Sequence, residues 1–119
     1  MKKAVANLEF ALKSENPDVV YRAGIIQFFE MSFELSWKTM KDFLEYNGYQ
    51  NVDSPRSVIK TAFQIQMIQD GKSWLECLES RNLMSHIYDE KTAEISEQKI
   101  RQNYIFLLKN LEAYLEKQL

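Results

Sequence analysis

Apolar residues recur at helical spacing along most of the chain. A first short helix is predicted over residues 2–14, whose apolar positions share one side: Val5, Leu8 and Leu12. The longest stripe consists of residues spaced by four, four, three and four positions: Phe29, Phe33, Trp37, Met40 and Leu44. A similar stripe continues to the last residues of the chain: Ile100, Tyr104, Leu107, Leu111 and Leu115. Because these spacings match about 3.6 residues per turn, each segment is predicted to be a helix with one apolar face.

Capping residues predict where the long helix and the one after it begin and end. Asn16-Pro17 suits the start of the long helix, since asparagine caps and proline fits the first helical position. Asn47-Gly48 suits its end, because glycine readily adopts the left-handed conformation. Ser54-Pro55 predicts the start of the next helix, which should end near Gln69, just before Asp70-Gly71.

The last two helices have signals of their own. Ser73 followed by Glu76 fits a capping box at the start of a fourth helix. This helix is expected to fray around Ser85-His86. Either Asp89 or Thr92 can cap the final helix, which runs to the end of the sequence.

These elements predict an all-α fold, an up-and-down four-helix bundle with an extra short N-terminal helix. No repeat, low-complexity segment or linker divides the chain, so residues 1–119 are expected to form a single domain. Ile25, Phe28 and Phe106 lie beside the main stripes, which makes the apolar faces wider than a four-helix core requires. We therefore expect at least a homodimer that buries the extra surface.

Composition narrows the classes of function. The net charge of −2, with no run of lysine or arginine, argues against a protein that coats nucleic acid. The single cysteine, Cys77, cannot form an internal disulfide, and no segment suits a signal peptide or a membrane helix. We therefore expect a cytoplasmic protein that does not contact a membrane. One histidine, one cysteine and no glycine-rich phosphate loop lead us to expect no metal and no cofactor.

The stretch 81–88 holds the residues best suited to chemistry, including the only histidine of the chain. On a helix, Arg81 lies on nearly the same side as Trp74, so it should point toward the bundle or its edge. An arginine in such a place needs an anionic or carbonyl partner. Two partners are open: an internal carboxylate such as Glu30 or Glu34, or the phosphate of a ligand.

His86 follows Arg81 by five residues, about 140° around an unbroken helix. Both can reach one ligand only if the helix loosens at Ser85 or a second chain supplies one of them. A lone histidine can be structural, or it can act as general base on a ribose 2′-hydroxyl while Arg81 stabilises the phosphorane charge. Asn82 could orient the phosphate or the imidazole. Tyr88 is either an interface residue or a phenol that contacts or accepts a nucleotide.

Taken together, Arg81, Asn82, His86 and Tyr88 form a motif, Arg-Asn-x-x-x-His-x-Tyr, that resembles the signature of HEPN proteins. More specifically, nearly the whole chain resembles the nucleotidyltransferase substrate-binding family, the HEPN partner of a minimal nucleotidyltransferase. Residues 26–38 resemble the long second helix of that family. The segments 54–56 and 70–90 resemble its next helix start and its central signature.

The resemblance implies a bundle that dimerises and places the Arg–His motif in a cleft between chains. It implies a two-gene toxin–antitoxin-like system, in which Arg81 and His86 are the catalytic pair of a metal-independent endoribonuclease. Asn82 and Tyr88 would bind the phosphate or substrate, and the nucleotidyltransferase would silence the toxin by AMPylation of Tyr88. Two other hypotheses stay open: a non-catalytic subunit that binds nucleotide or substrate for the nucleotidyltransferase, and a structural adaptor.

Overall fold

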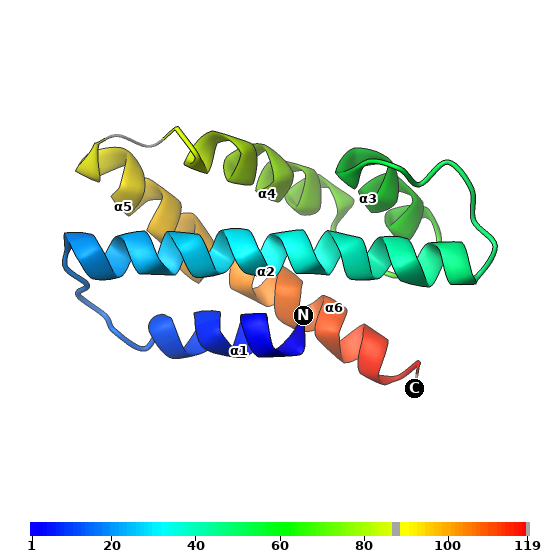
Figure 1. Ribbon diagram of the computed structural model, residues 1–119, viewed down its shortest axis with the longest axis horizontal. Coiled ribbons are helices and arrows are strands. Elements are labelled where there is room, and N and C mark those ends of the chain that lie inside the picture. The colour runs from blue at the N-terminus through cyan, green and yellow to red at the C-terminus, as the bar shows by residue number, and fades with distance from the viewer. Residues whose placement is uncertain (87–88, 119) are drawn as a thin grey trace.

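Helices make up all the regular secondary structure in the computed structural model, which describes residues 1–86 and 89–118 (Figure 1). The elements follow in chain order: α1 (Lys2–Ala11), α2 (Val19–Tyr46), α3 (Pro55–Gln64), α4 (Gly71–Met84), α5 (Glu90–Lys99), the π-helical segment η1 (Ile100–Tyr104) and α6 (Ile105–Glu116). The backbone stays helical on both sides of η1, so α5, η1 and α6 form one continuous rod. The predicted all-α class is therefore confirmed.

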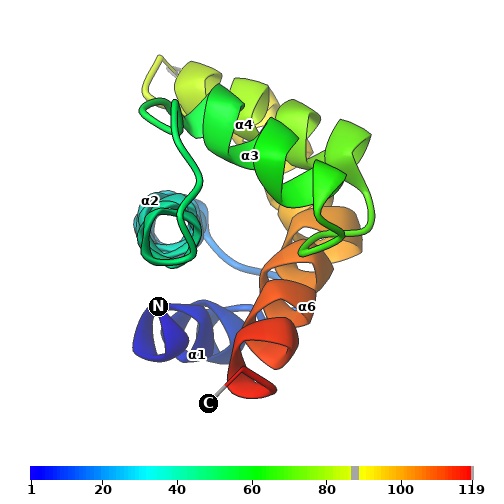
Figure 2. The ribbon, with the colours of Figure 1, turned by 90° about the vertical axis from the view of Figure 1, so that its right-hand side faces the viewer.

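The long helix α2 organises the bundle. Its 28 residues span about 42 Å at 1.5 Å per residue, nearly the full 45 Å length of the molecule. The short helix α1 lies along one side of α2, and α3 and α4 together lie along another (Figure 1). In the end view, the rod of α5, η1 and α6 closes the side opposite α2 (Figure 2). This is the predicted up-and-down bundle with a short additional N-terminal helix.

Aromatic side chains connect α2 with α4 and with η1 in the centre of the core. The rings of Phe29 and Tyr104 stack with centroids 5.5 Å apart, and Phe33 lies 6.1 Å from Trp74. All four side chains are at most 3% exposed. Burial of such rings removes large apolar areas from water and fixes α4 against the middle of α2.

Two of the predicted helix starts are wrong, because an aspartate caps each helix instead. The first residue of α2 is Val19, and the side chain of Asp18 accepts a hydrogen bond of 2.7 Å from the backbone N–H of Tyr21. Pro17 remains in the preceding loop, where its carbonyl accepts a hydrogen bond from Arg22. The other two predicted helix starts are confirmed, because the proposed capping residues act there. Ser54 caps α3 and Asp89 caps α5.

At the start of α4, Asp70 caps the helix and Ser73 donates to it, rather than Ser73 acting as the cap. The carboxylate of Asp70 accepts from the backbone N–H of Ser73 at 3.0 Å and from its hydroxyl at 2.7 Å. These hydrogen bonds lower the pKa of Asp70. The helix before it ends at Gln64 rather than near Gln69, because a left-handed residue, Gln66, turns the chain so that Met67 enters the core.

The sequence placed three apolar residues beside the main stripes: Ile25, Phe28 and Phe106. In the structure of one chain, only the first of them is fully buried. Ile25 is fully buried in the core, and Phe28 is partly buried against it. Phe106 is 55% exposed, so α6 does not bury it within one chain. Among the described residues, no helix combines the length and apolar character needed to cross a bilayer.

Candidate functional site

The motif lies at the C-terminal end of α4, where the helix opens into a turn. The helix ends at Met84, whose side chain is buried, and Ser85 is its C-cap. The backbone N–H of His86 donates to the carbonyl of Leu83 at 3.0 Å, while the His86 side chain is exposed. The helix therefore loosens at Ser85, as the sequence predicted, and the buried methionine fixes the position of the turn.

Arg81 forms an ion pair with Glu34 of α2, one of the two internal carboxylates that the sequence suggested. The Nη2 atom of Arg81 donates to Oε2 of Glu34 at 2.9 Å, and each side chain is 34% exposed. The other carboxylate oxygen, Oε1, lies 3.4 Å from Nζ of Lys38, one helical turn further along α2. Glu34 thus lies between two cations at the junction of α2 and α4.

The structure brings together only part of the predicted site. Arg81 Nη1 donates a long hydrogen bond of 3.4 Å to the side chain of Asn82, which is itself exposed. Arg81 Nε is buried and has no hydrogen-bond partner among the described residues. Within residues 1–86 and 89–118, no hydrogen bond or ion pair joins Arg81 to His86. Tyr88 lies outside the described residues.

A groove of about 300 Å³ lies next to the motif, where the start of α2, the end of α4 and the start of α5 meet. Its lining includes Val19, Met84, Asp89 and Glu90, so it borders the motif turn on both sides. Asp89 accepts a hydrogen bond of 2.7 Å from the backbone N–H of Thr92, and this contact lowers the pKa of its carboxyl. The lining of the groove is mostly apolar, with two acidic residues, Asp89 and Glu90.

A buried charge network fixes the start of α5, and no sequence motif pointed to it. Glu97 is only 5% exposed, and its two oxygens accept hydrogen bonds of 2.7 Å from Nε of Arg22 and Nε of Arg101. Arg22 also pairs with Glu90, the first residue of α5. Arg101 donates in addition to backbone carbonyls of the loop between α1 and α2. The network therefore ties α5, α2 and that loop together.

Burial alone would raise the pKa of Glu97, but the hydrogen bonds from Arg22 and Arg101 outweigh it and lower the pKa below its ordinary value. The only local sequence signal was the i,i+4 spacing of Glu97 and Arg101. Pairs with this spacing are usually exposed to solvent, so the spacing alone did not predict that this pair would be buried.

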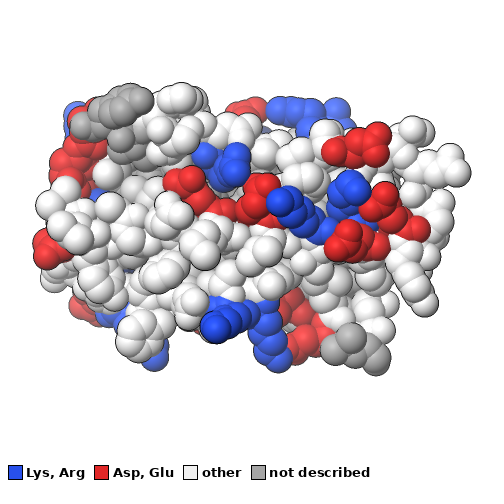
Figure 3. Space-filling view, in the orientation of Figure 1, with Lys and Arg blue, Asp and Glu red and all other residues white. Residues whose placement is uncertain are grey.

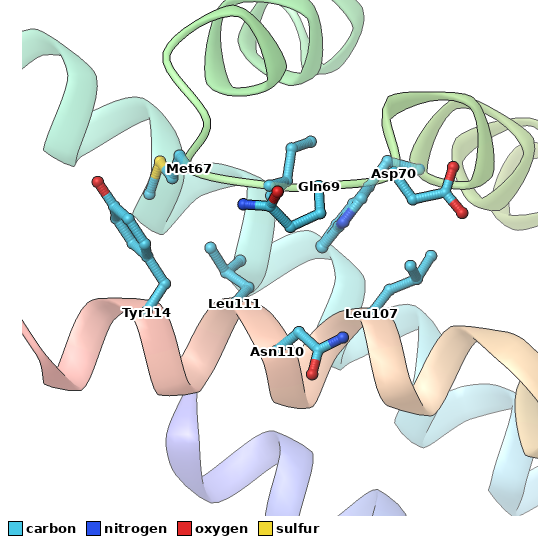
Figure 4. Close-up of a pocket in the computed structure, with 9 residues that line it drawn as sticks. Met67, Gln69, Asp70, Leu107, Asn110, Leu111 and Tyr114 are labelled. Atoms are coloured by element: carbon cyan, nitrogen blue, oxygen red, sulfur yellow. The ribbon is translucent and has the colours of Figure 1, made fainter.

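A separate cavity of about 140 Å³ lies between α6 and the segment that connects α3 to α4 (Figure 4). Met67 and Gln69 face Leu107 and Tyr114 across it. None of the predicted site residues lines this cavity.

Other reactive groups are few in the part of the chain that the structure describes. No cluster of three or more histidine, cysteine, aspartate or glutamate side chains suited to a metal is found there. Cys77 is fully buried in the core, and burial raises the pKa of its thiol well above the ordinary value.

The chain is an all-helical bundle with Arg81 near the end of α4 and His86 just after it, and the comparisons identify it as a HEPN-like domain. The family described as "Nucleotidyltransferase substrate binding protein like" matches residues 1–117. The chain therefore belongs to the nucleotidyltransferase substrate-binding protein family.

Individual relatives agree with this assignment. Over 75 residues, which are 60% of this chain and 51% of the relative, the chain is 33% identical to "Probable ribonuclease HepT" of Haemophilus influenzae. The match thus spans about half the length of that relative. A solved structure from Thermus thermophilus has a TM-score of 0.88 and 30% identity over 96% of this chain and 97% of its own.

A second solved structure is that of HI0074 from Haemophilus influenzae, described as revealing the fold of a substrate-binding domain of a nucleotidyltransferase. It has a TM-score of 0.83 and 26% identity, with 95% of each chain covered. Both similarities extend over the whole bundle, from α1 to α6.

Proposed function

We propose that this chain is the HEPN subunit of a toxin–antitoxin-like pair with a minimal nucleotidyltransferase, and that it cleaves RNA without a metal. The observation that carries the proposal is the end of α4, which presents a partly exposed Arg81 and an exposed His86 beside a groove in a chain of this family. The relative named a probable ribonuclease gives further support.

The proposed chemistry begins with His86 as general base. Its imidazole takes the proton of a ribose 2′-hydroxyl, and the 2′-oxygen forms a bond to the adjacent phosphorus. The bond from phosphorus to the 5′-oxygen of the next nucleotide breaks, and that oxygen takes the proton back from the imidazolium. Arg81 stabilises the negative charge on the phosphorane, and Asn82 orients the phosphate. The products are a 2′,3′-cyclic phosphate and a 5′-hydroxyl end.

We expect two copies of the chain to form the working unit. The exposed apolar side chains of α2 and α4 would be covered in such a dimer: Val20 (77% exposed), Met31 (47%), Leu35 (42%) and Leu83 (68%). Figure 3 shows a broad uncharged area on the left and centre of this face, with charged side chains of both signs above it, to its right and along its lower edge. A second copy would also let the Arg81 of one chain and the His86 of another approach one phosphate.

Light scattering at micromolar concentration is expected to give a mass of two chains. Leu35→Glu is expected to shift the mass to one chain, because a charge in the covered surface would be desolvated. Phe10→Glu is the control and is expected to leave the mass at two chains, since Phe10 is also exposed (69%) but belongs to α1. A mass of one chain for the unmodified protein would contradict the dimer.

The nucleotidyltransferase partner is expected to modify Tyr88. Co-expression with a nucleotidyltransferase encoded beside this gene should add one or more adenylates to Tyr88, visible as a mass increase on the peptide that contains it. A phenol bearing phosphates next to the motif would repel an RNA phosphate and so silence cleavage. Tyr88→Phe should remove the added mass, and an unmodified Tyr88 after co-expression would argue against silencing by this route.

The alternative function is a non-catalytic subunit that binds nucleotide or substrate for the nucleotidyltransferase. In this alternative the same residues bind a phosphate without turnover, and the description of the family as a substrate-binding protein supports it. The HI0074 structure, described as a substrate-binding domain, gives this alternative further support. Cytoplasmic location is part of both proposals.

Incubating the purified protein with a defined RNA in the presence of a chelator separates the two functions. Cleavage that leaves cyclic phosphate ends supports the ribonuclease. Binding of RNA or nucleotide in a calorimetric titration, without cleavage, supports the binding subunit. If neither cleavage nor binding occurs, both proposals fail and a structural adaptor remains.

A further inference from the structure

We propose that the carboxylate of Glu34 competes with incoming phosphates for Arg81. Every phosphate that binds Arg81 must therefore displace Glu34. The inference rests on the proposed function only in assuming that Arg81 receives a phosphate of RNA or of a nucleotide. It assigns a role to a residue of α2 that lies outside the sequence motif. Glu34 would therefore lower the affinity of the site and keep the arginine neutralised while no substrate is bound.

The geometry gives Glu34 a second cation to turn to when it is displaced. One oxygen of its carboxylate accepts from Arg81 at 2.9 Å, and the other lies 3.4 Å from the ammonium group of Lys38. Lys38 is on the same helix, one turn away, so Glu34 can release Arg81 and still keep an ion pair. A carboxylate that gives up Arg81 therefore keeps its contact with Lys38 and is not left as an isolated charge.

Exposure allows the exchange to occur in the folded protein. The side chains of Arg81 and Glu34 are each 34% exposed, and that of Lys38 is 56% exposed. An ion pair this accessible to water is weak, because water screens the charges and both side chains lose freedom on pairing. A phosphate that makes two charge-assisted hydrogen bonds to a guanidinium is a stronger partner. The phosphate therefore displaces Glu34 from Arg81. Its apparent affinity for the site is lower than it would be without Glu34, because the ion pair has to be broken first.

Glu34→Gln tests the competition directly. The probe is a short single-stranded RNA whose 2′-hydroxyls are methylated, so that it binds but cannot be cleaved by attack of the 2′-oxygen. We expect Glu34→Gln to bind this RNA about three- to tenfold more tightly than the unmodified protein, because the competing charge is lost while the size of the side chain is kept. Fluorescence anisotropy at fixed low ionic strength measures the change.

The chain offers a matched control on the same helix. Glu45 pairs with Lys41 at 2.8 Å, also at i,i+4 spacing, but has no arginine partner among the described residues. Glu45→Gln removes the same formal charge from α2 and is expected to change the affinity by less than about twofold. The comparison separates local competition from a general change in net charge.

Lys38→Met gives a second, opposite test. Without Lys38, Glu34 has only Arg81 as partner within the described part of the chain, so the RNA should bind about two- to threefold more weakly. If Lys38 acts through Glu34, Lys38→Met should have no such effect when Glu34→Gln is already present. An equal loss in both backgrounds would mean that Lys38 attracts the RNA by itself, and would contradict the exchange between two partners.

The outcomes also distinguish this inference from the proposed function. If the unmodified protein binds the RNA and Glu34→Gln binds it equally well or more weakly, Glu34 is not a competitor but at most a positioning residue for Arg81, and the inference is overturned while the proposed function stands. If neither protein binds the RNA, the proposed function fails together with the inference. Tighter binding by Glu34→Gln alone, with Glu45→Gln unchanged, supports both.

Discussion

His86→Ala is expected to lower the rate of RNA cleavage by roughly 10²- to 10⁴-fold, the usual contribution of a positioned general acid–base group. The imidazole is the only one in the chain, so no neighbouring histidine can replace it. Its side chain is exposed, and a substitution at such a place changes the free energy of unfolding by less than about 0.5 kcal/mol. The loss should therefore appear in the cleavage rate and not in thermal unfolding.

The control for this experiment is Ser85→Ala at the preceding position. Ser85 is also exposed, and its hydroxyl donates to the backbone carbonyl of Asn82. We expect Ser85→Ala to cleave RNA at a rate within about threefold of the unmodified protein, because no catalytic group is lost. Equal cleavage by the unmodified protein and His86→Ala would remove the histidine from the mechanism. If His86→Ala binds RNA as tightly as the unmodified protein, the substitution has impaired the cleavage step and not RNA binding.

Glu97→Gln is expected to destabilise the fold by about 2–3 kcal/mol, the largest effect on stability that the structure suggests for one polar side chain. Breaking a buried ion pair typically costs about 3–5 kcal/mol, since the remaining charge has no partner. The cost here should be smaller, because Arg22 and Arg101 keep other acceptors in Glu90 and the backbone. For a domain of this size, the melting temperature should fall by roughly 10 °C.

The pH dependence of stability checks the cause. Because the pKa of Glu97 is lower in the folded state, its contribution is complete at pH values above the ordinary value of 4.5 and is lost as the pH falls through the folded-state pKa. The difference between the unmodified protein and Glu97→Gln should therefore be full at neutral pH and shrink below about pH 4. A difference that does not shrink at any pH below the ordinary value at which the protein stays folded would rule out the charge as its origin.

Glu90→Gln is the matched control for Glu97→Gln, since both carboxylates pair with Arg22. Glu90 is 42% exposed where Glu97 is 5% exposed. The exposed partner is expected to contribute less than about 1 kcal/mol. If Glu90→Gln destabilised the protein as much as Glu97→Gln, burial would not be the reason for the strength of the network.

The helices and their order could be predicted because their signals are local. Apolar spacing located α2 and the final rod, and Ser54, Gly48 and Asp89 acted at the helix ends where the sequence placed them. The wrong starts near Asn16 and Ser73 have one cause: in each case a neighbouring aspartate could also cap, and its carboxylate accepts the capping hydrogen bond in the fold. The caps in the fold are Asp18 and Asp70.

The candidate site was predicted only in part. The sequence located the turn after Met84 and proposed Glu34 as one partner of Arg81, because both follow from helical geometry and from the need to pair a half-buried charge. The i,i+4 spacing of Glu34 and Lys38 also predicts their ion pair, which the structure confirms, but it does not indicate that Glu34 holds Arg81 at the same time. That arrangement depends on the rotation of α2 against α4, which the packing of Phe33 on Trp74 determines.

By itself, the sequence determined that this protein is a helical bundle whose one histidine and a nearby arginine stand at a helix end. Periodicity and capping are interactions between residues a few positions apart, so they can be read along the chain. Only the tertiary structure decided which charged side chains pair between distant helices. Arg81 pairs with Glu34, 47 positions away in the sequence, and Arg22 with Glu97, 75 positions away. Such pairs depend on how whole helices pack, and no local pattern records that packing.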